Sequence, residues 1–214
     1  MKFSDQSIFQ KKQKYDLFNN KIYELVECGK TVLDIGCATG KLLENLKKNK
    51  NCQVFGIESD KEMAKEAARI CENLICDDVE SCNLPFQKEF FDIIILADVL
   101  EHLKRPDILL EKLKFYIKRN GCLLISIPNI AFFLARLNLF FGKFDYTEYG
   151  IMDKTHLRFF TLKTAKRLIE QSGYKIVYLQ GYNQVKARYF FLKPLGMIFK
   201  TFFATDFIVK AAIK

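Results

Sequence analysis

The chain has 214 residues, of which 50% are hydrophobic and 28% are charged, a composition that excludes a disordered protein and indicates a globular one. Its formal net charge of +9 permits an anionic partner, but the basic residues are scattered along the chain, which makes nucleic acid an unlikely partner. Its seven cysteines form no C-x-x-C pair, and no apolar run has the length of a membrane span, so we expect reduced thiols and a cytoplasmic location.

The first part of the chain alternates predicted strands and helices. After an amphipathic helix over Tyr15–Cys28, apolar runs predict five strands, and helical patterns follow most of them. The strands are expected at Val32–Ile35, Gln53–Ile57, Asn73–Cys76, Phe91–Ala97 and Cys122–Ile127. The helices are expected at Gly40–Lys48, Lys61–Cys71 and Pro106–Lys118. This alternation predicts a doubly wound α/β fold with a parallel sheet and helices on both faces, in one domain over residues 1–214.

The pattern changes after Pro128. We expect an aromatic-rich helix over Asn129–Phe141 and an irregular segment after it, so that residues 129–160 form an insertion or lid. A helix over Leu162–Gln171 and strands over Tyr174–Tyr182 and Asp206–Ile213 complete the chain. Apolar residues at helical spacing between 195 and 203 predict a further helix. That helix either packs on the protein or lies on an anionic membrane surface.

A strand, a turn with two glycines and a helix follow one another in Thr31–Gly40 and the residues after it. Gly36 and Gly40 suit a backbone that turns tightly and lets a ligand approach closely. The start of the next helix offers free N–H groups to a carboxylate or phosphate. This arrangement is the first half of a nucleotide-binding βαβ unit.

Acidic residues stand just past the ends of the first four predicted strands. They are Asp34, Glu58, Asp77 with Asp78, and Asp98. In open α/β sheets ligands bind at the carboxyl ends of the strands, and Glu58 has about the usual spacing for a ribose-binding carboxylate. Several carboxylates suit a cationic ligand better than a pyrophosphate. The charges therefore favour S-adenosylmethionine, which carries a sulfonium and an ammonium group, over NAD.

Taken in order, these motifs resemble those of class I S-adenosylmethionine-dependent methyltransferases. The resemblance also includes the segments Leu84–Phe86 and Ala97–Leu103. It implies a seven-stranded, mostly parallel sheet whose last strand is antiparallel. Ala38 departs from the family pattern, which has glycine there, so we expect a slightly different turn rather than a broken one. The resemblance implies cofactor-binding roles for Asp34, Gly36, Cys37, Gly40, Glu58, Ser59, Asp77, Asp78, Val79 and Asp98.

Two later segments, Ser126–Asn129 and Asp153–Thr161, resemble a bacterial-type subgroup of these enzymes that is often associated with cell-surface glycan genes. The resemblance favours a methyltransferase that O-methylates a glycan, a lipid-linked or a small-molecule acceptor. N-methylation and RNA-directed methylation remain alternatives, as does a partner subunit that binds the cofactor without turnover. A peripheral membrane contact through residues 195–203 is a further expectation.

The chain has only two histidines, His102 and His156, and both fall in segments expected to border the acceptor. The sequence D-x-x-E-H…H resembles the metal-ligand pattern E-x-x-E-H…H of ubiquinone-pathway and small-RNA O-methyltransferases. Asp98 stands in place of the first glutamate, and Asp98 with Glu101 could instead be a helix-capping pair. We therefore expect no metal and assign a histidine as the general base.

Overall fold

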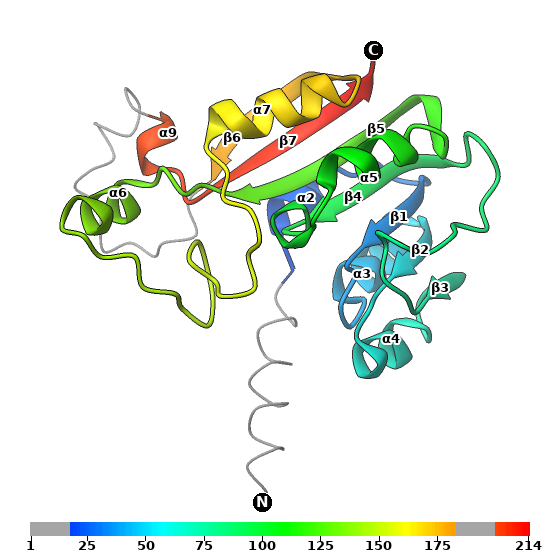
Figure 1. Ribbon diagram of the computed structural model, residues 1–214. Helices are drawn as coiled ribbons and strands as arrows, with labels where there is room; N and C mark the ends of the chain where they lie inside the picture. The colour runs from blue at the N-terminus through cyan, green and yellow to red at the C-terminus, as the bar shows by residue number, and fades with distance from the viewer. Residues whose placement is uncertain (1–17, 183–199) are drawn as a thin grey trace, which may run out of the picture. The chain divides into compact units, whose positions relative to one another are not determined.

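The computed structural model describes residues 18–182 and 200–214, and its seven strands form one sheet in the order β3-β2-β1-β4-β5-β7-β6 (Figure 1). Two compact units can be described separately. The first runs to Ala97 and includes Phe115–Cys122, and the second comprises Asp98–Lys114 and the chain from Leu123 onward. The expectation of a seven-stranded, mostly parallel sheet is confirmed.

Parallel strands make up the sheet of the first unit. The central strand β1 (Thr31–Ile35) pairs with β2 (Gln53–Ile57) on one side and β4 (Phe91–Ala97) on the other. The short strand β3 (Asn73–Ile75) pairs with β2. Strand β1 is buried at four of its five positions, as expected for an apolar strand covered on both faces.

Helices α2 (Asn20–Leu25), α3 (Lys41–Lys50) and α4 (Lys61–Ala67) belong to the same unit, and Figure 1 shows α3 and α4 beside β1, β2 and β3. Each helix after a strand begins where the sequence offers a suitable residue. Gly40 adopts a left-handed conformation before α3, and the side chain of Asp60 accepts two backbone N–H bonds at the start of α4. The carboxyl ends of β1 and β2 are thereby held next to helix starts.

The second unit contains the later helices and an antiparallel strand pair. Strands β6 (Tyr174–Tyr182) and β7 (Asp206–Ile213) pair antiparallel, and α7 (Leu162–Gln171) runs beside them (Figure 1). Strand β5 (Ile117–Pro128) begins in the first unit and ends in the second. The other elements are the 3-10 turn η1 (Leu100–His102), α5 (Pro106–Leu113), α6 (Phe133–Phe140) and α9 (Lys200–Phe203).

The expected bounds are correct for β2, β4, α7, β6 and β7, but the start of β5 was placed five residues too late. The helix predicted to Lys118 ends at Leu113, and β5 begins at Ile117. Lys118 pairs with Asp92 at 2.9 Å, and a Cβ on Gly121 would lie 2.8 Å from the backbone oxygen of Asp92. The close contact with β4 therefore extends the strand through residues that lack an apolar pattern.

Three other helices are shorter than predicted, among them α2, which ends at Leu25 rather than Cys28. Helix α6 begins at Phe133 rather than Asn129, because the Asn129 side chain accepts the Ala131 N–H and Ile130 N donates to Phe160 O. Helix α4 ends at Ala67, after which i→i−3 bonds tighten the chain.

The helix expected over residues 195–203 lies mostly outside the described residues. Of the residues that are described there, Phe202 and Phe203 stack or tilt against Phe133 with ring centroids 6.0 and 5.3 Å away. In the described parts of the chain we find no helix with the length and apolarity needed to cross a bilayer.

Candidate active site

The glycine-rich turn after β1 has a left-handed backbone at alternate positions. Gly36, Ala38 and Gly40 have φ angles of 71°, 49° and 80°. The N–H groups of Gly36 and Cys37 both donate to Ile57 O of β2, at 2.8 and 3.1 Å. Ala38 adopts this conformation despite its Cβ, at a cost of roughly 1–2 kcal/mol, so its departure from the family pattern leaves the turn formed.

Glu58 fixes this turn from the end of β2. Its side chain is 8% exposed, and its two oxygens accept the N–H groups of Ala38 and Asp60, each at 2.8 Å. A carboxylate has about four lone-pair sites, so both oxygens can accept further bonds. Glu58 is therefore both a structural part of the turn and an available acceptor for hydroxyl groups.

Asp34 lies below the turn with 4% of its surface exposed. Burial, and then the negative charge of Glu58, raises the pKa of its carboxyl to about 8. Near neutral pH the Asp34 carboxyl can therefore hold a proton and act as a donor. A cationic ligand close by would favour its charged form.

The start of α3 and the hydroxyl of Thr39 lack side-chain hydrogen-bond partners among the described residues. No side chain caps α3, so the first-turn N–H groups have no side-chain partner. The Thr39 hydroxyl is buried and has no hydrogen-bond partner in the described part of the chain. A ligand that carries a carboxylate could satisfy these donors. Sequence reasoning missed Thr39, although its place between Ala38 and Gly40 was a signal.

The remaining predicted cofactor residues of the first unit lie near strand ends. Asp77 and Asp78 follow β3 with exposed carboxylates, each of which accepts one local backbone N–H, and Val79 is buried. Ser59 is exposed, with its hydroxyl 3.5 Å from Glu58. Their positions suit contacts with an adenosine group at the edge of a parallel sheet.

Cys37 is a packing residue. Burial raises the pKa of its thiol well above the ordinary value, so the nucleophilic thiolate is disfavoured. A Cβ on Gly56 would lie only 2.7 Å from the Cys37 sulfur, which shows how tightly the sulfur fills the space above β2.

In the second unit, Asp98 directly follows β4 with a φ of 54°. Its carboxylate accepts a bond from the Ser126 hydroxyl at 2.6 Å, and its N–H donates to the same hydroxyl at 3.0 Å. Turn η1 begins after Val99 without any side-chain cap. The alternative that Asp98 and Glu101 form a helix-capping pair is therefore wrong, because Asp98 is bonded to the end of β5 instead.

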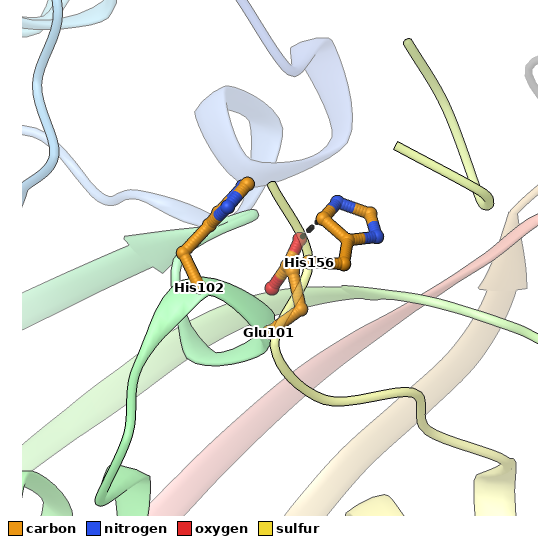
Figure 2. A group of neighbouring side chains, drawn as sticks. All are labelled: Glu101, His102 and His156. Atoms are coloured by element: carbon orange, nitrogen blue, oxygen red, sulfur yellow. Dashed lines mark ion pairs between the residues drawn. The ribbon is translucent and has the colours of Figure 1, made fainter. Parts of the chain in front are cut away.

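Glu101 is 1% exposed, and among the described residues neither of its carboxylate oxygens has a hydrogen-bond partner. Figure 2 shows its ion pair with His156. Burial, followed by the charge of Asp98, raises the pKa of Glu101 well above its usual range. The nearest imidazole nitrogen, Nε2 of His156, is 4.0 Å from Oε1. A buried carboxyl in this state is either protonated or awaits a cation.

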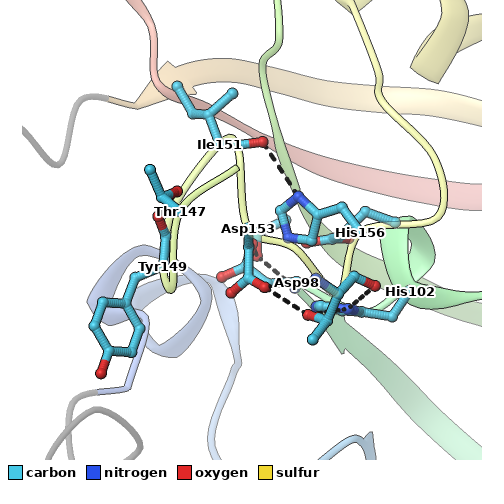
Figure 3. Close-up of polar contacts among 10 residues, drawn as sticks. Asp98, His102, Thr147, Tyr149, Ile151, Asp153 and His156 are labelled. Atoms are coloured by element: carbon cyan, nitrogen blue, oxygen red, sulfur yellow. Dashed lines mark hydrogen bonds and ion pairs between the residues drawn. The ribbon is translucent and has the colours of Figure 1, made fainter. Parts of the chain in front are cut away.

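The two histidine rings come together from segments more than fifty residues apart, with centroids 4.8 Å apart (Figures 2 and 3). His156 Nδ1 lies 3.2 Å from Ile151 O, and His102 Nδ1 lies 3.2 Å from Thr155 O. A carbonyl oxygen can only accept, so each neutral ring keeps its proton on Nδ1. In this tautomer the lone pair of each ring is on Nε2, and Nε2 of His156 lies beside the Glu101 carboxyl.

The segment that carries His156 is held by its own hydrogen bonds (Figure 3). The buried Asp153 accepts the N–H and the hydroxyl of Thr155 at 2.9 and 2.7 Å. Leu157 and Arg158 donate their N–H groups to the backbone oxygen of Glu101 at 2.8 and 3.0 Å. Sequence reasoning missed Asp153 and Thr155 as positioning residues, although the D-K-T-H sequence contains both.

Glu101, His102 and His156 could hold a metal ion. One ligand atom from each lies within 4.8 Å of the others. Metal-binding histidines commonly donate their second N–H to a carbonyl, as both rings do here, and two imidazoles with a carboxylate suit Mn²⁺, Fe²⁺ or Zn²⁺. Asp98 does not belong to this group.

Comparison with known proteins gives the family. A family model described as a methyltransferase domain matches residues 9–179. The ubiquinone biosynthesis O-methyltransferase of Coxiella burnetii is 33% identical over 110 residues, 49% of this chain and 46% of that protein. The (S)-tetrahydroprotoberberine N-methyltransferase of Eschscholzia californica is 29% identical over 106 residues, 47% of this chain and 30% of that protein. The match thus spans half or less of these curated relatives.

A solved structure of an S-adenosylmethionine-dependent methyltransferase from Archaeoglobus fulgidus has the same fold. It superposes with a TM-score of 0.67 at 19% identity, covering 96% of this chain and 99% of that one. The predicted methyltransferase resemblance is confirmed at the level of family and fold, and the chain belongs to the methyltransferase-domain family.

Proposed function

We propose that this chain transfers the methyl group of S-adenosylmethionine to a hydroxyl oxygen of a glycan, lipid-linked or small-molecule acceptor. The observation that carries the oxygen preference is the position of the His156 ring, whose Nδ1 lies 3.2 Å from the Ile151 carbonyl oxygen, so that in its neutral form the basic lone pair is on Nε2. A hydroxyl must lose its proton when its oxygen is methylated, whereas a neutral amine can attack first. A fixed neutral imidazole supplies that base.

Bound S-adenosylmethionine would supply an electrophilic methyl group on a sulfonium. The residues around the glycine-rich turn fit this ligand. Glu58 offers carboxylate oxygens to ribose hydroxyls, and the uncapped start of α3 with the Thr39 hydroxyl offers donors to the ligand's carboxylate. Gly36, Cys37 and Gly40 would leave the turn open to close approach.

The other predicted cofactor residues have supporting roles in this proposal. Asp34 would balance the ligand's positive charge, and Asp77, Asp78 and Val79 would contact the adenosine. The expected further contacts are Ser59 and Asp98.

His156 would act as the general base and His102 as its neighbour. The Asp153–Thr155 bonds and the Glu101 backbone hold both rings, so the base is positioned before the acceptor binds. Burial raises the pKa of the Glu101 carboxyl beside the rings well above its usual range, which favours its neutral form. A positioned base typically contributes about 10²–10⁴-fold to a rate.

A metal ion at Glu101, His102 and His156 is the second form of this proposal, favoured by the two unpartnered Glu101 oxygens. In that form the metal would lower the pKa of the acceptor hydroxyl. We favour the base, since Asp98 is bonded to Ser126 rather than joining the three ligands.

Transfer of labelled methyl groups tests the proposal. The full chain is incubated with methyl-labelled S-adenosylmethionine and separate panels of hydroxyl and amine acceptors. We expect label on hydroxyl acceptors, and in His156→Ala a kcat lower by about 100-fold or more with KM for the methyl donor unchanged. Binding of S-adenosylhomocysteine without transfer to any acceptor would favour a non-catalytic partner subunit. Label on amines alone would favour N-methylation.

We also propose that the protein contacts the membrane surface, a location suited to a lipid-linked acceptor. Helix α6 has no buried residue, and Leu139, Phe140 and the C-cap residue Phe141 at its end are 60%, 82% and 67% exposed. Lys143 follows these side chains in the sequence and would lie near anionic headgroups.

A further inference from the structure

A cavity of about 800 Å³ lies in the second unit, lined by residues of α7, by Arg136 of α6 and the segment before that helix, and by Phe207 of β7. Glu101, His102 and His156 do not line this cavity. Its charged lining consists of four cations and one carboxylate: Arg136, Lys163, Lys166, Arg167 and Glu170. A cavity with this excess of positive charge favours an anionic ligand.

Three of these cations lie on one face of α7. Lys163, Lys166 and Arg167 are spaced i, i+3 and i+4, so they are neighbours on the helix surface. Like charges at this spacing repel one another and destabilise the helix. In the described part of the chain no carboxylate lies within salt-bridge distance of any of the three. Lysines of α3 and α4, by contrast, pair with glutamates of their own helices.

Two contacts hold the Arg136 side chain in place. Its Nε donates to Ala131 O at 2.6 Å, and its guanidinium lies 5.5 Å from the centroid of the Phe202 ring. These contacts use the Nε and the flat face, and within the described residues the two Nη groups have no hydrogen-bond partner. A guanidinium in this state is suited to a bidentate bond with a phosphate.

The backbone N–H groups at the start of α7 are not the groups that would bind the anion. Thr161 and Thr164 form a reciprocal capping box, so the helix terminus already has side-chain partners. The side-chain cations are thus the groups that remain for an anion.

The cavity adjoins the histidine segment along the chain. Thr161, which lines the cavity, is five residues after His156, and the intervening Phe160 is held by the N–H of Ile130. An acceptor could therefore place a charged group in the cavity while another part extends towards His156.

We propose that this cavity binds the phosphate or pyrophosphate group of an anionic ligand. Resting on the proposed function, we identify that ligand as the methyl acceptor. The acceptor is then a phosphate-bearing molecule, anchored by Arg136 and the cations of α7 at a distance from the hydroxyl that is methylated.

Inorganic pyrophosphate is the probe for this site. Its binding to the full chain is measured by calorimetry at low and high salt, in the wild type and in Lys166→Glu/Arg167→Glu. The matched control is Lys61→Glu/Arg69→Glu, which reverses one lysine and one arginine on the exposed surface in and just after α4. We expect the first variant to lose at least about tenfold in affinity and the control to stay within about twofold. Wild-type affinity should fall as salt rises.

The neutral variant Lys166→Gln/Arg167→Gln should fall between wild type and the reversed variant. Equal pyrophosphate affinity in wild type and the reversed variant would overturn the site, as would no binding to wild type at low salt. Binding of anionic vesicles without binding of pyrophosphate would also overturn it, because a surface rather than a cavity would then be the anionic site. S-adenosylhomocysteine affinity, measured on the same proteins, should be unchanged. If wild type does not bind S-adenosylhomocysteine, the proposed function is refuted, while the result for pyrophosphate binding to the cavity remains valid.

Discussion

Replacing Asp34 with asparagine should remove a loss of folding stability that occurs as the pH rises. The folded carboxyl has a pKa of about 8, because burial and then the charge of Glu58 disfavour its ionised form. The unfolded carboxyl has a pKa of about 3.9. Between these values the folded state keeps the proton and the unfolded state loses it, so the free energy of unfolding falls with rising pH and is constant below about pH 4.

The size of the effect follows from the difference between the two pKa values. About 4 pH units at about 1.4 kcal/mol each give an upper limit of about 6 kcal/mol, of which about 3 kcal/mol falls between about pH 5 and pH 7. Asparagine has the shape of the protonated carboxyl and does not titrate. The stability of Asp34→Asn relative to wild type should therefore increase steadily over this range. Urea unfolding at a series of pH values measures it.

Asp92→Asn is the matched control on a neighbouring strand. Burial acts to raise the Asp92 pKa, but the Thr31 N–H and the Lys118 ammonium, each at 2.9 Å, outweigh it and the pKa is lowered. Its contribution is complete above about pH 4 and is lost only in acid, so the difference between Asp92→Asn and wild type should stay constant from about pH 5 to pH 8. An Asp34→Asn difference that is equally constant would refute the assignment of a protonated, buried Asp34.

Three further outcomes are expected. Glu58→Ala should weaken S-adenosylhomocysteine by about tenfold or more in calorimetry, and unchanged affinity would contradict a ribose contact. Glu101→Gln should keep activity if a neutral Glu101 stands beside a histidine base, whereas lost activity together with chelator sensitivity in wild type would favour the metal form. Phe140→Ser/Phe141→Ser should reduce sedimentation with anionic vesicles while Phe115→Ser, an exposed aromatic of the first unit, should not. Wild type that stays in the supernatant at low salt would contradict a membrane contact.

Buried parallel strands appear in the sequence as short apolar runs. The ends of these runs can therefore be located, and with them the acidic residues at the ends of the strands. Asp34 and Glu58 could be placed once the ends of those runs were located. The pairing of His102 with His156 was expected only as a shared location, because no local pattern encodes a contact across more than fifty residues.

Other features depend on tertiary contacts that the local pattern does not contain. The capping interpretation of Asp98 used a correct spacing, but the Ser126 hydroxyl on another strand took the carboxylate. The early start of β5 depends on the contact of Gly121 with the backbone of β4. The burial of Glu101 could not be predicted either, because the local pattern does not distinguish it from its neighbour His102, which is exposed in the structure.

Local rules of protein structure are broken where the candidate site lies. Four residues other than glycine have positive φ in the described chain, and one of them, Ala38, lies in the glycine-rich turn. In the same unit Asp34 is a buried carboxyl with a raised pKa, and the buried Thr39 hydroxyl has no hydrogen-bond partner among the described residues. Each of these costs folding free energy, of order 1–3 kcal/mol for a strained backbone or an unpaired polar group. A ligand with positive charge and hydrogen-bonding groups would recover part of that cost on binding. The strain therefore supports placing the methyl donor beside the glycine-rich turn independently of the family match.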